Sequence, residues 1–264
     1  MSPDDVRRII ELSDHFAVRE GSIFEAQNAP SFGVLEEKLS LVPDDAMFLL
    51  PDESIHREPV APALADGQAY VVASFHPYSG EFGNQTLYIE HCSQLVRDAI
   101  EFTGLPVVLL PQEGNLKLEA IPELDVEFQD ELQRSLSHKS VLRARDFGID
   151  ASVALVSGSS LVLSTRYHPV VWALGNAVPA VGLSVDNYTR AKIQGVMKFF
   201  EVHSSFLDHA SLTVSGITRT LERTWEDRRE TSSRLKALGS ACQELQNRWW
   251  DEVTTARPKN SPSG

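Results

Sequence analysis

An arginine and a histidine stand two positions apart, as Arg166 and His168, directly before Pro169. The apolar run over 160–164 predicts a buried strand, and proline is favoured at the first position of a helix. The spacing therefore predicts that both side chains lie in the turn between that strand and a helix beginning at Pro169. Unpaired N–H groups at a helix start favour an anion, a guanidinium matches phosphate or carboxylate, and an imidazole can transfer a proton. The alternative is that Arg166 pairs with a structural carboxylate and His168 only caps the helix.

A second candidate segment, 74–84, follows the first strong apolar run and contains His76 and Tyr78. Its small residues let backbone amides approach a ligand, and its aromatic rings can stack on a sugar. A polar loop with incidental aromatic residues is an equally good interpretation. The sequence contains no P-loop, G-x-S-x-G elbow, G-x-G-x-x-G run or metal-spaced cluster of His and Asp.

Alternating strands and helices must position these residues. Predicted strands span 69–75, 105–110, 140–144, 160–164 and 178–184, and predicted helices span 87–103, 129–136, 149–157 and 169–175. Apolar strands joined by helices indicate an α/β fold with a doubly wound parallel sheet that is covered on both faces. Ligands of such sheets bind beyond the carboxyl ends of the strands.

Four parts are predicted along the chain. Residues 1–63 form a small N-terminal unit and a proline-rich linker, and residues 64–215 form the main α/β lobe. Residues 216–253 form one or two charged helices that pack on the body, and 254–264 form a disordered tail. Within the first unit we expect helices over 6–17 and around 20–26, and short strands over 16–19 and 38–43.

Composition narrows the classes of function. The chain has 264 residues, of which 42% are hydrophobic, and a formal net charge of −13 from 24 basic and 37 acidic residues. No window of about 18 apolar residues and no signal peptide is present, which predicts a soluble, cytoplasmic protein. Two cysteines are too few for a disulfide framework or a zinc site. The acidic balance argues against broad nucleic-acid binding.

Several segments together resemble the polysaccharide pyruvyl transferase family. Residues 165–169, followed by 173–183, resemble its Arg-aromatic/Leu-His segment and the "Gly-Val-Pro-Val-Val-Gly" strand after it. The further resemblances are 186–195 to its Tyr-Asp-x-Lys region, 18–22 to "Val-Arg-Asp-x-x-Ser", 41–49 to "Val-Pro-Asp-Pro-Ala-Phe-Leu", and Asp125 to a family Asp. In order and spacing these segments cover roughly residues 16 to 240.

The resemblance implies a glycosyltransferase-B-like fold, in which the main lobe is the C-terminal lobe. A partial N-terminal lobe would precede it and a long C-terminal helical segment would follow. Two features depart from the family: the strand and Gly- and Asn-rich loop that open its N-terminal lobe have no counterpart here, and Gln112 stands where many members carry a His. Either the reading frame is truncated or the chain is a separate, reduced relative.

The resemblance also implies a reaction. Phosphoenolpyruvate would donate its pyruvyl group to two hydroxyls of one sugar, forming a ketal, in exopolysaccharide or cell-wall biosynthesis. Phosphoenolpyruvate is then the donor substrate, and neither a cofactor nor a metal is expected. His168 would be the acid/base and Arg166 the anion clamp, with Arg19 approaching from the other lobe and Arg190 or Lys192 adding charge from a loop. Apart from the resemblance, the loop over 74–84 offers His76 and Tyr78 as further substrate-binding residues.

The implied partner is a glycan or a lipid-linked sugar acceptor, which would bring the chain to membrane-linked glycan machinery. Exposed strand edges of an incomplete lobe favour a homo-oligomer. Two other functions stay open. One is a non-catalytic relative that binds a sugar or a partner chain through its open side. The other is a glycosyltransferase that uses a nucleotide sugar, because a fold does not fix a function.

Overall fold

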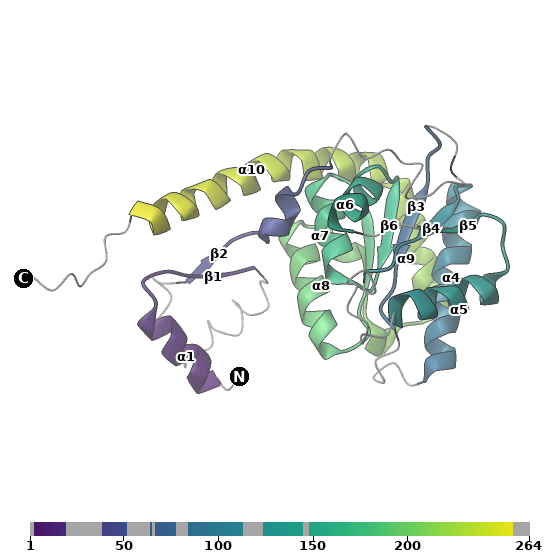
Figure 1. Cartoon of the computed structure of the whole chain (residues 1–264), viewed down its shortest axis with the longest axis horizontal. Helices are drawn as coiled ribbons and strands as arrows, with labels where there is room; N and C mark the ends of the chain where they lie inside the picture. Colours follow the sequence, from purple (N-terminus) through teal and green to yellow (C-terminus); the bar gives the residue numbers. More distant parts are fainter. Residues whose placement is uncertain are drawn as a thin grey trace, which may run out of the picture.

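The computed structural model describes residues 3–19, 39–51, 64, 67–77, 84–112, 124–144 and 148–255. A six-stranded sheet with the order β5-β4-β3-β6-β7-β8 lies at its centre, and every pairing in it is parallel (Figure 1). The strands are β3 (Val71–Ser74), β4 (Val107–Leu109), β5 (Val141–Arg143), β6 (Leu161–Ser164), β7 (Ala180–Leu183) and β8 (Phe206–Leu207). This confirms the predicted doubly wound parallel sheet. The chain order reverses between β3 and β6, which makes that seam the topological switch point.

Both faces of the sheet are buried at its central strands, because most positions of β3, β4, β6 and β7 carry apolar side chains. Val72 and Val162 belong to one hydrophobic core, whereas their neighbours Val71 and Leu161 belong to the other. Successive side chains of a strand point to opposite faces, so the two cores lie on the two sides of the sheet. The uninterrupted apolar runs in the sequence follow from this double burial.

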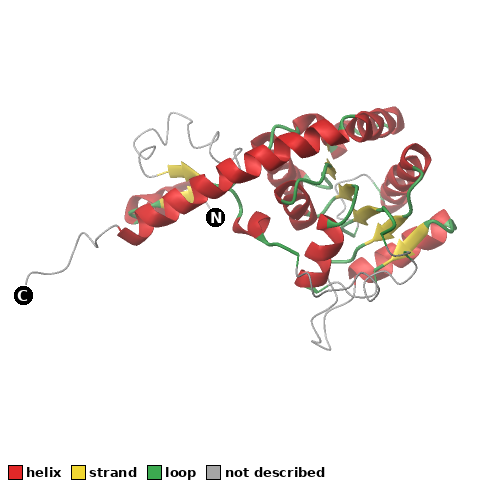
Figure 2. Ribbon diagram, turned by 90° about the horizontal axis from the view of Figure 1, so that it is seen from above, coloured by secondary structure: helices red, strands yellow, loops and turns green. Residues whose placement is uncertain are grey.

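Helices supply the two outer layers (Figure 2). One core receives side chains of α4 (Gln85–Thr103), α5 (Leu124–Leu136) and α9 (Val214–Glu226). The other receives side chains of α6 (Ile149–Ser157), α7 (Tyr167–Gly175), α8 (Asn187–Phe199) and α10 (Arg228–Thr255). Short 3-10 turns, η3 (His203–Ser205) and η4 (His209–Ser211), flank β8.

Helices beside the carboxyl edge of the sheet differ from the sequence-based expectations. α7 begins at Tyr167 rather than at Pro169, so His168 lies in the first turn and Pro169 occupies a position whose N–H needs no intrahelical partner. α5 begins at Leu124, five residues earlier than predicted. The segment expected to be a loop around Arg190 and Lys192 is helix α8, which a capping box starts. β8 was not predicted, because two residues carry no periodicity.

The N-terminal unit contributes α1 (Pro3–Leu12), a parallel pair of strands, β1 (Phe16–Val18) and β2 (Leu39–Leu41), and a 3-10 helix, η2 (Asp45–Phe48). The helix expected over 6–17 is therefore shorter and begins earlier, with strand β1 taking its last residues. The helix expected around 20–26 and most of the linker lie outside the described residues.

The C-terminal segment is helical, as expected, and divides into α9 and α10. α10 runs from the main lobe toward the side on which the N-terminal unit lies (Figure 1). It continues to Thr255, so two residues assigned to the tail are helical, and the rest of that tail lies outside the described part of the chain. The domain boundaries at 63, 215 and 253 stay predictions. Among the described helices, none has the length and apolar character that a membrane crossing requires.

Candidate functional site

A pocket of about 310 Å³ opens at the carboxyl edge of the sheet, beside the switch point between β3 and β6. Four strand exits contribute to it, which is where parallel α/β sheets place ligands. Its lining residues are His76 after β3, Gln112 after β4, Thr165, Arg166, Tyr167, His168 and Pro169 after β6, and Asp186, Tyr188, Thr189 and Lys192 after β7.

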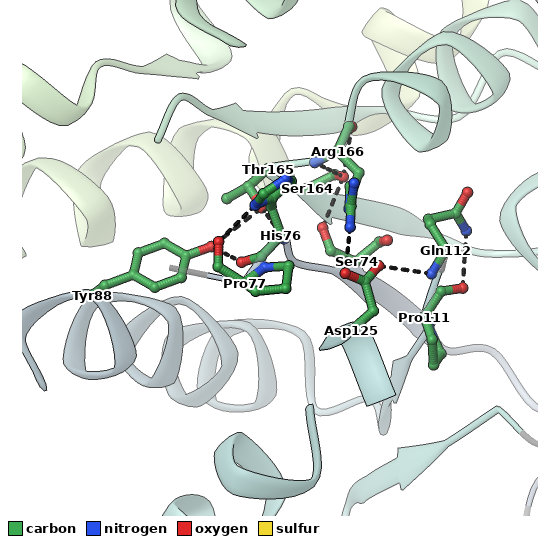
Figure 3. A network of polar contacts seen from close by, with 10 residues as sticks. All are labelled: Ser74, His76, Pro77, Tyr88, Pro111, Gln112, Asp125, Ser164, Thr165 and Arg166. Atoms are coloured by element: carbon green, nitrogen blue, oxygen red, sulfur yellow. Dashed lines mark hydrogen bonds and ion pairs between the residues drawn. The ribbon is translucent and has the colours of Figure 1, made fainter. Parts of the chain in front are cut away.

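Arg166 lines this pocket while forming an ion pair with Asp125 (Figure 3). Its Nη2 donates to Oδ1 of Asp125, which is fully buried, and the other carboxylate oxygen accepts the backbone N–H of Gln112 at 3.0 Å. Asp125 reaches this place because α5 starts earlier than its apolar pattern indicates. The structure therefore contains the structural pairing that was the alternative interpretation of Arg166. The carboxylate fixes the guanidinium and offsets part of its charge.

His168 is exposed at the pocket, although part of its ring is covered by neighbours. It stacks on Trp172 with ring centroids 5.9 Å apart and meets the edge of Tyr167 at 5.5 Å. Partial burial lowers the pKa of His168; the charge of Asp44 opposes this, and the charges of Arg19 and Lys192 add to it. A lowered pKa leaves the imidazole neutral at neutral pH, the form that accepts a proton.

Two cations approach the Tyr167 ring from different parts of the chain. Arg19 Cζ, from the N-terminal unit, and Lys192 Nζ, from α8, each lie 4.9 Å from its centroid. Lys192 also lies 4.8 Å from the ring of Tyr188 and donates to its hydroxyl at 3.0 Å. Arg19 pairs with Asp44, but no carboxylate among the described residues pairs with Lys192. Lys192 is thus the cation in this group whose charge is least offset.

His76 is fixed against the end of β6. Its backbone N–H donates to Thr165 Oγ1 at 2.5 Å, and its carbonyl accepts the Tyr88 hydroxyl (Figure 3). Its Nδ1 lies 2.6 Å from the Pro77 carbonyl, which can only accept, so the ring proton sits on Nδ1. Burial raises the pKa of Tyr88 well above its ordinary value, so its phenol stays a neutral donor here.

The predicted site residues separate into three groups. Arg166, His168, His76 and Lys192 line one pocket, and Arg19 lies against its Tyr167 wall. Arg190 is not among the lining residues: its Nε pairs with Asp208 Oδ2 at 3.1 Å. Tyr78 lies outside the described residues.

Sequence reasoning missed Tyr188, Asp44 and the wall formed by Tyr167. The spacing Asp186-x-x-Thr189 is the signal that predicts the start of α8. With that start, Tyr188 and Lys192 fall four residues apart on one helical face. No comparable signal links Asp44 to the pocket, because the link depends on tertiary packing.

A nearby cluster has the composition of a hydrolase triad but not its geometry. Ser184 Oγ lies 2.8 Å from His209 Nδ1, and the same nitrogen lies 3.4 Å from Asp208 Oδ1. A Ser-His-Asp triad needs the serine and the carboxylate on different ring nitrogens. Ser184 is also fully buried. The cluster therefore holds the end of β7 to η4. Separately, among the described residues no group of three His, Cys, Asp or Glu side chains could hold a metal ion.

Comparisons with known proteins bear on the family and on the fold. The model of a family described as polysaccharide pyruvyl transferase matches residues 2–187. No protein of curated function matches the sequence.

Solved structures with a similar fold include Staphylococcus aureus MnaA with UDP, at TM-score 0.56, 13% identity, 99% of this chain and 67% of that one. A UDP-GlcNAc 2-epimerase from Methanocaldococcus jannaschii in complex with UDP-GlcNAc and UDP matches at TM-score 0.53 and 13% identity, over 88% and 62%. The trehalose 6-phosphate synthase of Burkholderia multivorans matches at TM-score 0.52 and 9% identity, and the match covers 98% of this chain and 63% of that one. The fold is thus of the glycosyltransferase-B type, and the chain spans about two-thirds or less of the length of these proteins.

Proposed function

Because the chain belongs to the polysaccharide pyruvyl transferase family, we propose that it transfers the pyruvyl group of phosphoenolpyruvate to a sugar of a polysaccharide. The product is a ketal, in which C2 of the pyruvyl group is bonded to two hydroxyl oxygens of one sugar. Exopolysaccharide or cell-wall glycans are the class of acceptor that fits this reaction.

One observation carries the proposal: a pocket at the switch point that is lined by two histidines and by two cations, Arg166 and Lys192. Phosphoenolpyruvate carries a phosphate and a carboxylate, so its site needs more than one positive group. Lys192 offers the least offset charge, whereas Asp125 and Asp44 partly offset Arg166 and Arg19. We therefore assign Lys192 and Arg166 to the anionic groups of the donor and place Arg19 at the edge of the site.

The reaction begins when neutral His168 takes the proton of the first sugar hydroxyl and passes it to the methylene carbon, which leaves positive charge at C2. The oxygen of the first sugar hydroxyl bonds to C2. The bond between C2 and the phosphate oxygen then breaks and its electron pair leaves with phosphate, and the oxygen of the second hydroxyl bonds to C2 to complete the ketal. One hydroxyl proton ends on the new methyl group and the other on inorganic phosphate, so the protons balance. His168 is neutral again once it has passed this proton on, and its lowered pKa suits a group that takes and releases a proton within one reaction.

The test is an assay with phosphoenolpyruvate and galactose- or mannosamine-type acceptors, following phosphate release and the mass of the acceptor. Acceptor-dependent phosphate release from the intact chain is expected. His168→Ala should lower turnover by a factor of about 10² to 10⁴ while sparing donor binding. If phosphate release is absent for every acceptor although phosphoenolpyruvate binds, a non-catalytic relative becomes the better conclusion.

A second candidate is a transferase that uses a nucleotide sugar. It is favoured by the similar fold of two proteins whose structures contain UDP. Calorimetry separates the two candidates: binding of UDP without binding of phosphoenolpyruvate supports the second, and the reverse supports the first.

A further inference from the structure

The last residue of α7, Gly175, touches the backbone of the N-terminal unit. A Cβ built on Gly175 would lie 2.3 Å from the Met47 carbonyl oxygen and 3.0 Å from the Met47 carbonyl carbon. Side-chain carbons do not approach other atoms within 3.0 Å, and a backbone carbonyl inside a 3-10 helix cannot turn away as a flexible side chain can. Only glycine therefore allows η2 to pack this closely on α7.

Two further contacts hold η2 at the same place. Asn176 Nδ2 donates to the carbonyl of Leu49, directly after η2, at 3.3 Å. Gln246 of α10 donates its side-chain amide to the Asp45 carboxylate. Met47 itself is buried in the core that α7 shares with α10. These contacts define a seat for η2, made by Gly175, Asn176 and Gln246.

The seat lies at the end of α7 away from the pocket, but a chain of contacts leads back to it. Asp44 caps η2, with Oδ1 accepting the Ala46 N–H at 2.9 Å. Its other oxygen pairs with Arg19, whose guanidinium lies 4.9 Å from the centroid of the Tyr167 ring. His168 follows Tyr167 in the chain and lies within electrostatic range of both charges.

We propose that Gly175 is a positioning residue: it admits the Met47 carbonyl, seats η2 on α7, and so holds the Asp44–Arg19 pair beside His168. The contribution of Arg19 to donor binding rests on the proposed function. The position of the pair does not, because it can be measured without substrate.

The test compares Gly175→Ala with Gly239→Ala. Gly239 lies within a helix too, in α10, but a Cβ there meets nothing within 4 Å. The ring of His168 is titrated by NMR in the ligand-free chain, and phosphoenolpyruvate binding is measured by calorimetry. Gly175→Ala should shift the titration and weaken binding about ten-fold, the lower end of what a charge-assisted hydrogen bond contributes. Gly239→Ala should change neither. If Gly175→Ala unfolds, Asn176→Ala loosens the same seat without a clash and should act in the same direction.

A double-mutant cycle distinguishes positioning from general destabilisation. Asp44→Asn keeps an oxygen to cap η2 but removes the charge that holds Arg19. If the seat acts through Asp44, adding Gly175→Ala to Asp44→Asn should move the titration no further. The proposal is overturned if His168 titrates identically in Gly175→Ala and in the wild type. It is also overturned if Gly175→Ala shifts the His168 titration as much in the Asp44→Asn background as in the wild type. Failure of the wild type to bind phosphoenolpyruvate overturns the proposed function, whereas the ligand-free titration still decides the role of Gly175.

Discussion

At the scale of single residues, the pocket combines cations that differ in how far their charge is offset. Arg166 and Arg19 each face a carboxylate, and Lys192 faces two aromatic rings and a hydroxyl. An incoming anion gains most from the cation whose charge no carboxylate already offsets, so the three residues should not contribute equally.

Lys192→Met should weaken phosphoenolpyruvate binding by about ten-fold or more. It should also raise the pKa of His168, because the positive charge of Lys192 lowers it. Arg190→Met is the matched control, since Arg190 lies on the same helix but pairs with Asp208. Calorimetry and the NMR titration of His168 measure both effects. Equal losses in the two variants would contradict the assignment of Lys192 to the donor site.

The pKa of His168 determines where kcat/KM falls on the acid side of its pH profile. Because that pKa is lowered, the neutral form persists below the ordinary value of about 6.5. If His168 acts as the base, kcat/KM should fall only as the pH drops through that lowered pKa, and Asp44→Asn should move this limb to still lower pH, since Asp44 raises the pKa. A profile whose acid limb does not respond to Asp44→Asn would remove His168 from the role of base.

Asp125→Ala should destabilise the fold by about 3 kcal/mol, because it removes the buried carboxylate that offsets the charge of the largely covered Arg166 guanidinium. The double variant Asp125→Leu with Arg166→Met should recover most of this loss, since no uncompensated charge remains. Urea unfolding measures both. A double variant as unstable as the single one would show that the pair is not the source of the loss.

At the scale of elements, the sequence predicts the strands that are buried on both faces and the helices whose apolar residues recur at a regular spacing. The apolar runs at β3, β4, β6 and β7 are recognisable because both faces of those strands are covered. Apolar spacing does not predict α8, because its first turns carry the polar residues of the pocket. The signal in the sequence for this helix is its capping box. The pairing of Arg166 with Asp125 joins residues 41 positions apart. Such a contact follows from topology and is invisible in local sequence.

Gly182→Ala, on β7, should destabilise the main lobe by about 1–3 kcal/mol. Its Cβ would lie 2.5 Å from Ile193 Cγ2 and 2.7 Å from Met197 Sδ, so these two side chains, or α8 that carries them, must shift away from β7. Because these neighbours are side chains, the fold should survive, and urea unfolding gives the loss. Stability equal to wild type would mean that α8 yields at no cost.

At the scale of the whole molecule, the N-terminal unit offers surface for association. Leu12 and Leu50 are 79% and 80% exposed, and β1 and β2 form a separate two-stranded sheet within the described residues. Unpaired strand edges and apolar side chains favour contact between copies.

Sedimentation should therefore show reversible association that grows with protein concentration. Added salt should strengthen it, because screening reduces the repulsion between chains of net charge −13. A compact monomer at high concentration in both low and high salt would contradict this expectation.

The seam between β3 and β6 also determines when the pocket comes into being during synthesis. Ser164 donates its hydroxyl to the Ser74 carbonyl across 90 positions of chain. During synthesis β3, β4 and β5 therefore leave the ribosome before β6. These three strands can pair with one another while the edge of β3 that later pairs with β6 is still unpaired. Closing that long loop is slow compared with local pairing. In a nascent or refolding chain, secondary structure should thus appear early and the capacity to bind an anion last.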